Sequence, residues 1–79
     1  MAEEKTFYQH KGVRSHEQGD ITNSAKRAAM VDHDEKYGRA GTFELVRFED
    51  FHQKNWREGL GGSIRKHKCS ITVVWEHKP

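Results

Sequence analysis

The sequence predicts an α+β fold in which one helix packs on a three-stranded antiparallel sheet, with the elements in the order β-α-β-β. Three stretches support this fold class. Residues 70–76 alternate apolar and polar side chains with the period of a strand, residues 25–30 have high helix propensity, and residues 41–49 supply a second strand candidate. We therefore expect residues 1–79 to form a single small domain.

The first strand is expected at residues 6–13, which are rich in aromatic side chains and are interrupted by Gly12. Successive side chains of a strand point to opposite faces of the sheet. We expect Phe7 to face the core, and we expect Tyr8 and His10 to face the other side.

The helix is expected to begin at one of several residues between Asp20 and Ser24, because short side-chain oxygens accept hydrogen bonds from the first unpaired N–H groups. Small side chains at spacings of three and four would let this helix lie close to a sheet. These residues are Ile21, Ala25, Ala28 and Ala29. We expect a charged, exposed turn at 32–36, with Tyr37 folding back onto the core and Gly38 stopping the helix.

The second strand is expected at 41–49, and two interpretations of it stay open. Phe43 and Leu45 point to one face of this strand, whereas Val46 and Phe48 point to the other. Either both faces of the strand are buried, or a β-bulge shifts the alternation near Leu45.

The segment from Asp50 to Leu60 is ambiguous. It could form a short helix capped by Asp50, with Trp56 and Leu60 four residues apart, but a long irregular hairpin loop is the preferred interpretation. The last strand follows this segment. Its apolar face consists of Ile71, Val73 and Trp75.

The composition predicts a small core and a polar surface. Hydrophobic residues make up 33% of the chain and the mean hydropathy is −1.05, but 10% of the residues are aromatic, which argues against disorder. Cys69 is the only cysteine, which excludes an internal disulfide and favours a reducing compartment. The first residues lack the apolar run of a signal peptide, and no stretch approaches the roughly 20 apolar residues of a membrane span. We therefore expect a cytoplasmic protein without a membrane partner.

Positive charge is concentrated in the last third of the chain. Residues 1–51 contain 8 Lys or Arg and 10 Asp or Glu, whereas residues 52–79 contain 6 Lys or Arg and only 2 Asp or Glu. Lysine and arginine can neutralise phosphates, and a tryptophan can stack on an unpaired base or anchor a protein interface. The candidate binding residues are Trp56, Arg57, Arg65, Lys66, His67 and Lys68.

Each feature of this candidate surface also has a plain structural interpretation. Charged residues at the edge of a sheet prevent pairing with other sheets and need not contact any ligand. Trp56 could equally fold over the edge of the sheet as a lid.

Signals for catalysis and metal binding are weak. Lys68 and His67 would favour the thiolate form of Cys69, but the sequence shows no base and oxyanion hole to accompany it. His67 and Cys69 are two residues apart, yet a zinc site needs a second close pair of ligands. The histidines are interpreted as surface residues. We therefore expect no enzymatic activity, no metal and no cofactor.

The helix at 25–29 followed by the strand at 41–45, in a chain of fewer than a hundred residues, resembles small phage proteins directed against host defence or transcription, anti-CRISPR proteins among them. Some proteins of that group have the order β-α-β-β and block a host enzyme by binding it. The order of elements is also similar to that of dodecin-type flavin binders, with residues 43–46 in the corresponding strand. The helix here lacks the aromatic and hydrophobic side chains that would suit a flavin.

The charge distribution and the resemblance together imply a non-enzymatic binding protein encoded by a phage or mobile element. It would bind and modulate a host protein or protein complex, in the host cytoplasm, through its C-terminal basic and aromatic surface. The alternative is a small nucleic-acid-binding protein that uses the same surface, for which a steep loss of affinity with salt is expected. A homo-oligomer is a further expectation, because a second copy would cover more of a small core.

Overall fold

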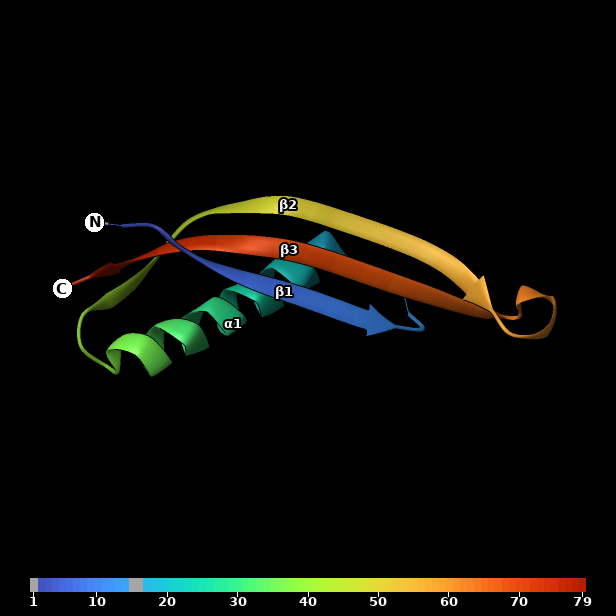
Figure 1. The fold of residues 1–79 in the computed structure, drawn as a ribbon, viewed down its shortest axis with the longest axis horizontal. Helices are drawn as coiled ribbons and strands as arrows, with labels where there is room; N and C mark the ends of the chain where they lie inside the picture. Colours follow the sequence, from blue (N-terminus) through green and yellow to red (C-terminus); the bar gives the residue numbers. More distant parts are fainter. Residues whose placement is uncertain (1, 15–16) are drawn as a thin grey trace.

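The computed structural model describes residues 2–14 and 17–79, and it confirms the predicted α+β fold (Figure 1). One helix lies against one face of a three-stranded antiparallel sheet, and the elements follow the order β-α-β-β. The elements are β1 (Glu4–Gly12), α1 (Gln18–Tyr37), β2 (Thr42–Glu58), the 3-10 turn η1 (Leu60–Gly62) and β3 (Ile64–Lys78).

β3 is the central strand, and β1 and β2 both pair with it in antiparallel orientation. The pairing with β1 runs from Glu4 opposite Trp75 to Gly12 opposite His67. β3, whose sequence alternates most clearly, is thus the strand whose backbone N–H and C=O groups are hydrogen-bonded to a neighbouring strand on each side.

A β-bulge near the start of β2 decides between the two interpretations of that strand. The register shifts between Leu45 and Arg47, so Val46 is the extra residue. The shift returns Phe48 to the face that carries Phe43 and Leu45, and all three of these side chains pack against the core. The alternative of a bulge near Leu45 is therefore confirmed.

The predicted loop at 50–60 is wrong, and so is the alternative of a short helix there. β2 continues to Glu58 and pairs with β3 as far as Ile64, after a second register shift between Glu49 and His52. Only the glycine-rich turn around η1 joins the two strands. Most side chains in this part of β2 are exposed on both faces, so the sequence lacks the alternation that marks a half-buried strand.

The hairpin of β2 and β3 projects beyond the rest of the molecule (Figure 1). Since β1 ends at Gly12, opposite His67, residues 56–66 form a two-stranded extension, here called the arm. The molecule is elongated as a result, with extents of 55 × 19 × 16 Å. The arm points to the right in Figure 1, and both labelled chain ends lie at the left.

The core lies between α1 and the side of the sheet that faces it. Its buried members are Ile21, Ala25 and Ala29 from α1 and Cys69, Ile71, Val73 and Trp75 from β3. The alanines allow α1 to lie close to the sheet, as the sequence predicts. Ala28, which the sequence places on the same face, is only partly buried.

The side chains of β1 point to the sides of the sheet opposite to those predicted. Thr6 and Tyr8 lie opposite buried residues of β3 and face α1, and His10 is on the same side. Phe7 points away from the helix and is 65% exposed. The predicted orientation of Phe7, Tyr8 and His10 is therefore wrong. A shift of one residue in the register reverses every side chain of a strand, and two adjacent aromatic residues do not indicate which of them points inward.

α1 extends further at both ends than the sequence predicts. It follows an N-cap at Glu17 whose side chain makes no capping hydrogen bond, so the expected N-cap at 20–24 is wrong. The predicted turn at 32–36 is helical as well. Gly38 does end the helix, with a φ of +64° and a hydrogen bond of 2.8 Å from its N–H to the carbonyl of Asp34, and Tyr37 packs against the core as predicted. Across residues 2–14 and 17–79, no helix has both the length and the apolar character that crossing a bilayer requires.

Candidate binding surface on the open face of the sheet

One face of the sheet is not covered by α1 and is here called the open face. The odd-numbered residues of β3 from Cys69 to Trp75 pack against α1, so the even-numbered residues from Lys66 to Glu76 point to the open face. In Figure 1 this face is turned toward the viewer, and α1 lies behind the sheet. Charged side chains on the open face fall into two zones, one near the chain ends and one toward the arm.

The zone near the chain ends carries charges of both signs, most of them joined in ion pairs. Lys5 lies 3.3 Å from Glu49, and Arg47 lies 2.7 Å from Glu49 and 2.8 Å from Glu3. Lys5 and Arg47 flank Val74 of the central strand, which is 0% exposed although it lies outside the main core cluster. Hydrogen bonds from Arg47 lower the pKa of the Glu3 and Glu49 carboxyls below their usual value. The two edge strands are thus tied together over β3 by ion pairs.

Acid should weaken the ion pairs of this zone. Because Glu3 and Glu49 have lowered pKa values in the folded protein, their stabilisation is complete above the ordinary carboxyl pKa of 4.5 and is lost as the pH falls through the folded values. We expect the urea midpoint of unfolding to drop below about pH 4.5. Arg47→Gln should make this drop shallower, whereas Arg39→Gln, at an exposed arginine outside the network, should not. Identical pH profiles for wild type and Arg47→Gln would contradict this account.

The zone toward the arm carries a row of like charges. Lys11 of β1 and Lys54 of β2 both lie opposite Lys68 of β3, so three lysines stand side by side across the three strands. Lys66 lies two residues before Lys68 on the same face, and Trp56 lies opposite Lys66. Lys11, Lys54, Lys66 and Lys68 are here called the lysine cluster.

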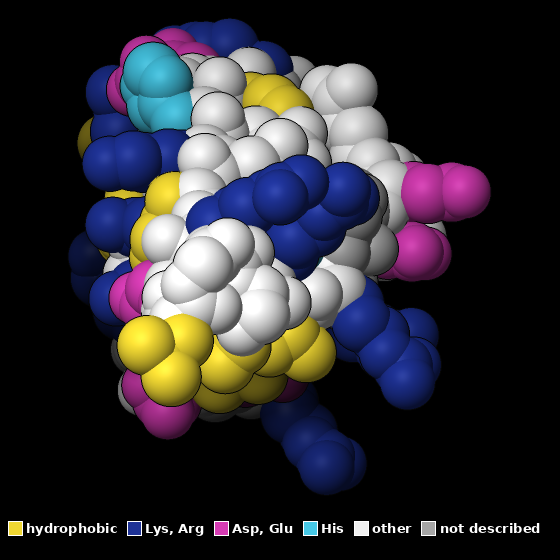
Figure 2. Space-filling view, turned by 90° about the vertical axis from the view of Figure 1, so that its right-hand side faces the viewer, with side chains coloured by type: hydrophobic (Ala, Val, Ile, Leu, Met, Phe, Trp, Pro, Cys, Tyr) yellow, Lys and Arg dark blue, Asp and Glu magenta, His cyan; other side chains and the backbone are white. Residues whose placement is uncertain are grey.

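Trp56 is half-buried among these lysines and does not pack against the core. Three surface hollows adjoin it. Every member of the lysine cluster lines one or other of the two hollows of about 350 and 340 Å³, and the third, of about 280 Å³, is lined by Lys66 together with Arg57, Arg65 and His67. The indole Nε1 donates a hydrogen bond of 3.0 Å to Oε1 of Glu58, which orients the ring. Figure 2 views the molecule from the arm end. The open face lies along its left-hand edge, where Lys and Arg side chains gather with hydrophobic side chains between them.

Among the described residues that line these hollows around the lysine cluster, only Glu58 is acidic, and its carboxylate accepts the hydrogen bond from Trp56. No member of the lysine cluster forms an ion pair with a carboxylate in the part of the chain that the structure describes. Like charges directly opposite one another destabilise a strand pair, so the row of three lysines raises the free energy of the folded protein. Four cations outside the cluster do have acidic partners, and these are Lys5, Lys36, Arg47 and Lys78. The other described cations outside the cluster form no ion pair either, so the cluster is distinguished by the closeness of its four lysines rather than by the lack of partners alone.

The strand pairing divides the six predicted binding residues between the two faces of the sheet, although all of them except Lys68 line one hollow of about 280 Å³ at the arm. On the open face lie Trp56, Lys66 and Lys68. On the opposite face lie Arg57, Arg65 and His67. Here His67 Nδ1 is 2.7 Å from Oδ1 of Asn55. Neighbouring residues in a strand point to opposite faces, so closeness in the sequence does not by itself make one surface.

Two members of the lysine cluster were not among the predicted binding residues. Lys54 lies two residues before Trp56, a spacing that places both on one face of a strand, but this signal was hidden while the segment was interpreted as a loop. Lys11 is distant from Trp56 in the sequence. Only the register between β1 and β3 brings Lys11 to this surface.

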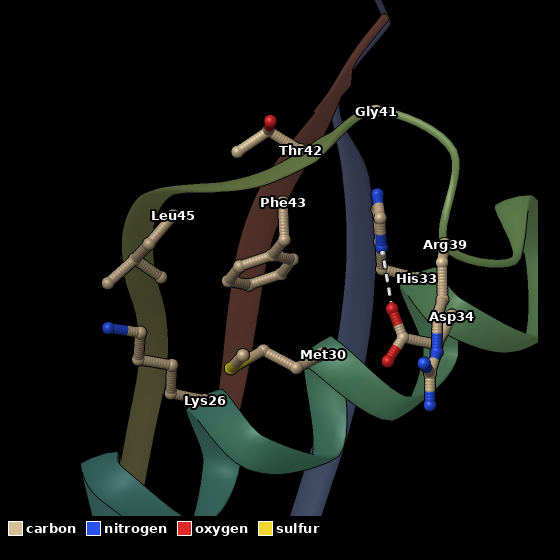
Figure 3. Close-up of a pocket in the computed structure, with 9 residues that line it drawn as sticks. All are labelled: Lys26, Met30, His33, Asp34, Arg39, Gly41, Thr42, Phe43 and Leu45. Carbon is tan, nitrogen blue, oxygen red and sulfur yellow. Dashed lines mark hydrogen bonds and ion pairs between the residues drawn. The ribbon is translucent and has the colours of Figure 1, made fainter.

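A further hollow lies where the second half of α1 faces the start of β2 (Figure 3). Its volume is about 470 Å³. Among its lining residues are apolar Met30, Phe43 and Leu45 and charged Lys26, Asp34 and Arg39. Because charged groups of both signs line this hollow, its electrostatic potential favours neither anionic nor cationic ligands.

His33 also lines this hollow, and it is only 3% exposed, so it is not the surface residue that the sequence suggested. Its Nε2 lies 2.9 Å from Nδ1 of His77 on β3, and its Nδ1 lies 3.1 Å from Oδ1 of Asp34. His77 in turn stacks on Tyr37, with ring centroids 3.9 Å apart. Both ring nitrogens of His33 are thus engaged, and the side chain fastens the end of α1 to the end of β3.

The residues considered for metal binding and catalysis are also accounted for by packing. Cys69 is buried in the core as a free thiol, and His67 is hydrogen-bonded to Asn55. Within residues 2–14 and 17–79, no three or more His, Cys, Asp or Glu side chains are grouped so that they could hold a metal ion.

The chain was compared with known proteins. No family model matches it, and no curated protein or solved structure matches it either. The arguments about function therefore rest on the chemistry of the surface.

Proposed function

We propose that this protein is a non-enzymatic binding module that holds nucleic acid on the open face of its sheet. The observation that carries the proposal is the lysine cluster, whose four cations surround Trp56 without carboxylate partners among the described residues. Lysines that neutralise phosphates release counterions, and an accessible indole ring stacks on a base. A ligand of this kind would supply the negative charge that the row of lysines lacks.

The side chains of this surface suit phosphate better than the centre of a protein interface. Lysine is depleted in protein–protein interfaces, where arginine and aromatic residues are enriched. Lysine does serve as a flexible point charge for phosphate groups. Trp56 and Arg57 point to opposite faces of the arm, although both line one hollow of about 280 Å³ at its edge.

A protein partner is the second candidate, and the tip of the arm favours it. Leu60 is 97% exposed and Ile64 is 45% exposed. Arg57 of β2 and Arg65 of β3 lie opposite each other, one residue further from the tip than the pair of Glu58 and Ile64. Exposed apolar side chains next to arginines are typical of protein-binding surfaces. Such a partner would be the host protein or complex that the resemblance to phage inhibitors implies, bound through the tip rather than through the lysine cluster.

Binding to fluorescently labelled oligonucleotides should weaken steeply with salt. If four lysines contact phosphates of a single strand, the affinity should fall about 50-fold between roughly 50 and 200 mM salt. Replacing the row of Lys11, Lys54 and Lys68 with alanine should remove most of this dependence. The same variant should be at least as stable as the wild type, because it removes like-charge repulsion. Fluorescence anisotropy measures the affinities, and thermal unfolding measures the stability.

The matched control removes three cations that lie away from the open face, by replacing Lys26, Arg27 and Arg39 with alanine. It changes the net charge by the same amount, so its salt dependence should stay close to that of the wild type. Equal effects of the two triple variants would indicate diffuse attraction and would overturn the assigned surface. Absence of nucleic-acid binding, with salt-insensitive binding to a protein that Leu60→Glu abolishes, would favour the second candidate instead.

A further inference from the structure

We infer that the nucleic acid held on the open face is single-stranded, and that Phe7 is a second stacking platform for its bases. This inference rests on the proposed function. Phe7 lies on the open face opposite Thr72 and is 65% exposed. A lone exposed apolar side chain is ordinary. What distinguishes Phe7 is its place relative to Trp56 and the lysine cluster.

Phe7 and Trp56 stand at the two ends of a diagonal across the open face. They lie opposite Thr72 and Lys66 of β3, so six residues, or roughly 20 Å, separate them along the strand. They belong to the two edge strands on either side of β3, which adds a separation of roughly 10 Å across the sheet. The two positions are therefore about 22 Å apart.

The paired positions between the two aromatic rings are basic or neutral, and the unpaired bulge residue Asp50 of β2 is the acidic residue between Glu49 and His52. The paired open-face positions between them hold Gln9, Lys11, His52, Lys54, Lys68 and Ser70. None of these six side chains is acidic. Glu49, which lies opposite Thr72 at the Phe7 end, is neutralised by Lys5 and Arg47. A polyanion can thus run from one ring to the other across the row of lysines.

Two aromatic rings on a sheet surface suit bases that are not already stacked. In a duplex the faces of the bases are covered by their neighbours, whereas a single strand can lay its bases on aromatic side chains. The lysines between the rings would neutralise the phosphates of the intervening nucleotides. The arrangement therefore favours single strands over duplexes, and it favours strands long enough to reach both rings.

A length series of single-stranded oligothymidylates tests this inference by anisotropy at constant salt. Affinity should rise with length until the strand spans Phe7 and Trp56, and it should level off beyond that length. Phe7→Leu keeps an apolar side chain but removes the ring, and it should weaken the long strands about 5- to 100-fold while leaving the shortest strands unaffected. Phe7→Tyr should bind like the wild type. The matched control Val31→Ala removes an exposed apolar side chain from α1 and should have no effect.

The inference and the proposed function fail in different ways. If Trp56→Ala weakens binding but Phe7→Leu does not, the second platform is wrong and the proposed function stands. If a duplex of equal length binds as tightly as the single strand, the single-strand preference is wrong and the proposed function again stands. If neither form of nucleic acid binds, both proposals are overturned. Circular dichroism of each variant shows that it is folded, as expected for changes at exposed positions.

Discussion

Replacing Trp75 with alanine should reduce the free energy of unfolding by about 3–5 kcal/mol, the usual cost of removing a large aromatic side chain from a core. Trp75 is 2% exposed, and the centroid of its ring lies 5.7 Å from those of His33 and of Phe43. Its indole Nε1 also donates a buried hydrogen bond of 2.9 Å to Oγ1 of Thr6. Because small domains have only about 5–15 kcal/mol of stability in total, this loss is a large fraction of the whole.

The same substitution at Trp56 is the matched control. Trp56 lies on the arm outside the core, so Trp56→Ala should cost less than about 1 kcal/mol. Trp75→Phe keeps an aromatic ring but removes the indole N–H, and it should cost about 1–2 kcal/mol, since the Thr6 hydroxyl still donates to Asp32. Urea unfolding followed by far-ultraviolet circular dichroism measures all three variants. Equal losses for the two tryptophan-to-alanine variants would contradict the placement of Trp75 in the core.

The fold class could be predicted because the segments that determine it are half-buried. Residues 70–76 alternate since α1 covers only one side of β3, and residues 25–29 are small because α1 lies close to the sheet. The bulge near Leu45 could be recognised as an alternative because the apolar side chains of this part of β2 also pack on one side only. Phe43, Leu45 and Phe48 can share one face of a strand only if an extra residue lies between the last two.

The candidate surface could be predicted only in part, because it depends on the register between strands. The row formed by Lys11, Lys54 and Lys68 exists only in the paired sheet, and its members are far apart along the chain. The distal part of β2 has no buried face, so its sequence carries no alternation from which a strand could be recognised. The sequence also does not indicate which side chains of β1 point inward, since either Phe7 or Tyr8 could have been the aromatic residue that packs on the core.

Replacing Gly41 with alanine should cost about 2–4 kcal/mol, although the change adds only one methyl group. Gly41 has a φ of +76°, and a Cβ atom there would lie 2.3 Å from the carbonyl oxygen of Lys78 and 2.3 Å from Cε1 of His77. The carbonyl belongs to the backbone of β3 and cannot move without disturbing the ladder to β2. The His77 ring is not free to turn away, because it stacks on Tyr37 and lies within hydrogen-bonding distance of His33.

Gly38→Ala is the matched control, because Gly38 lies in the same connection between α1 and β2. Its φ is +64°, and no atom beyond its two neighbours in the chain lies within 4 Å of the position that a Cβ would take. It should therefore show only the conformational cost of a left-handed residue, about 1–2 kcal/mol. The difference between the two urea midpoints measures the clash alone, and faster amide hydrogen exchange at the start of β2 should appear only in Gly41→Ala. Equal midpoints would mean that the end of β3 moves aside without cost, and that the contact between His33 and His77 does not hold it in place.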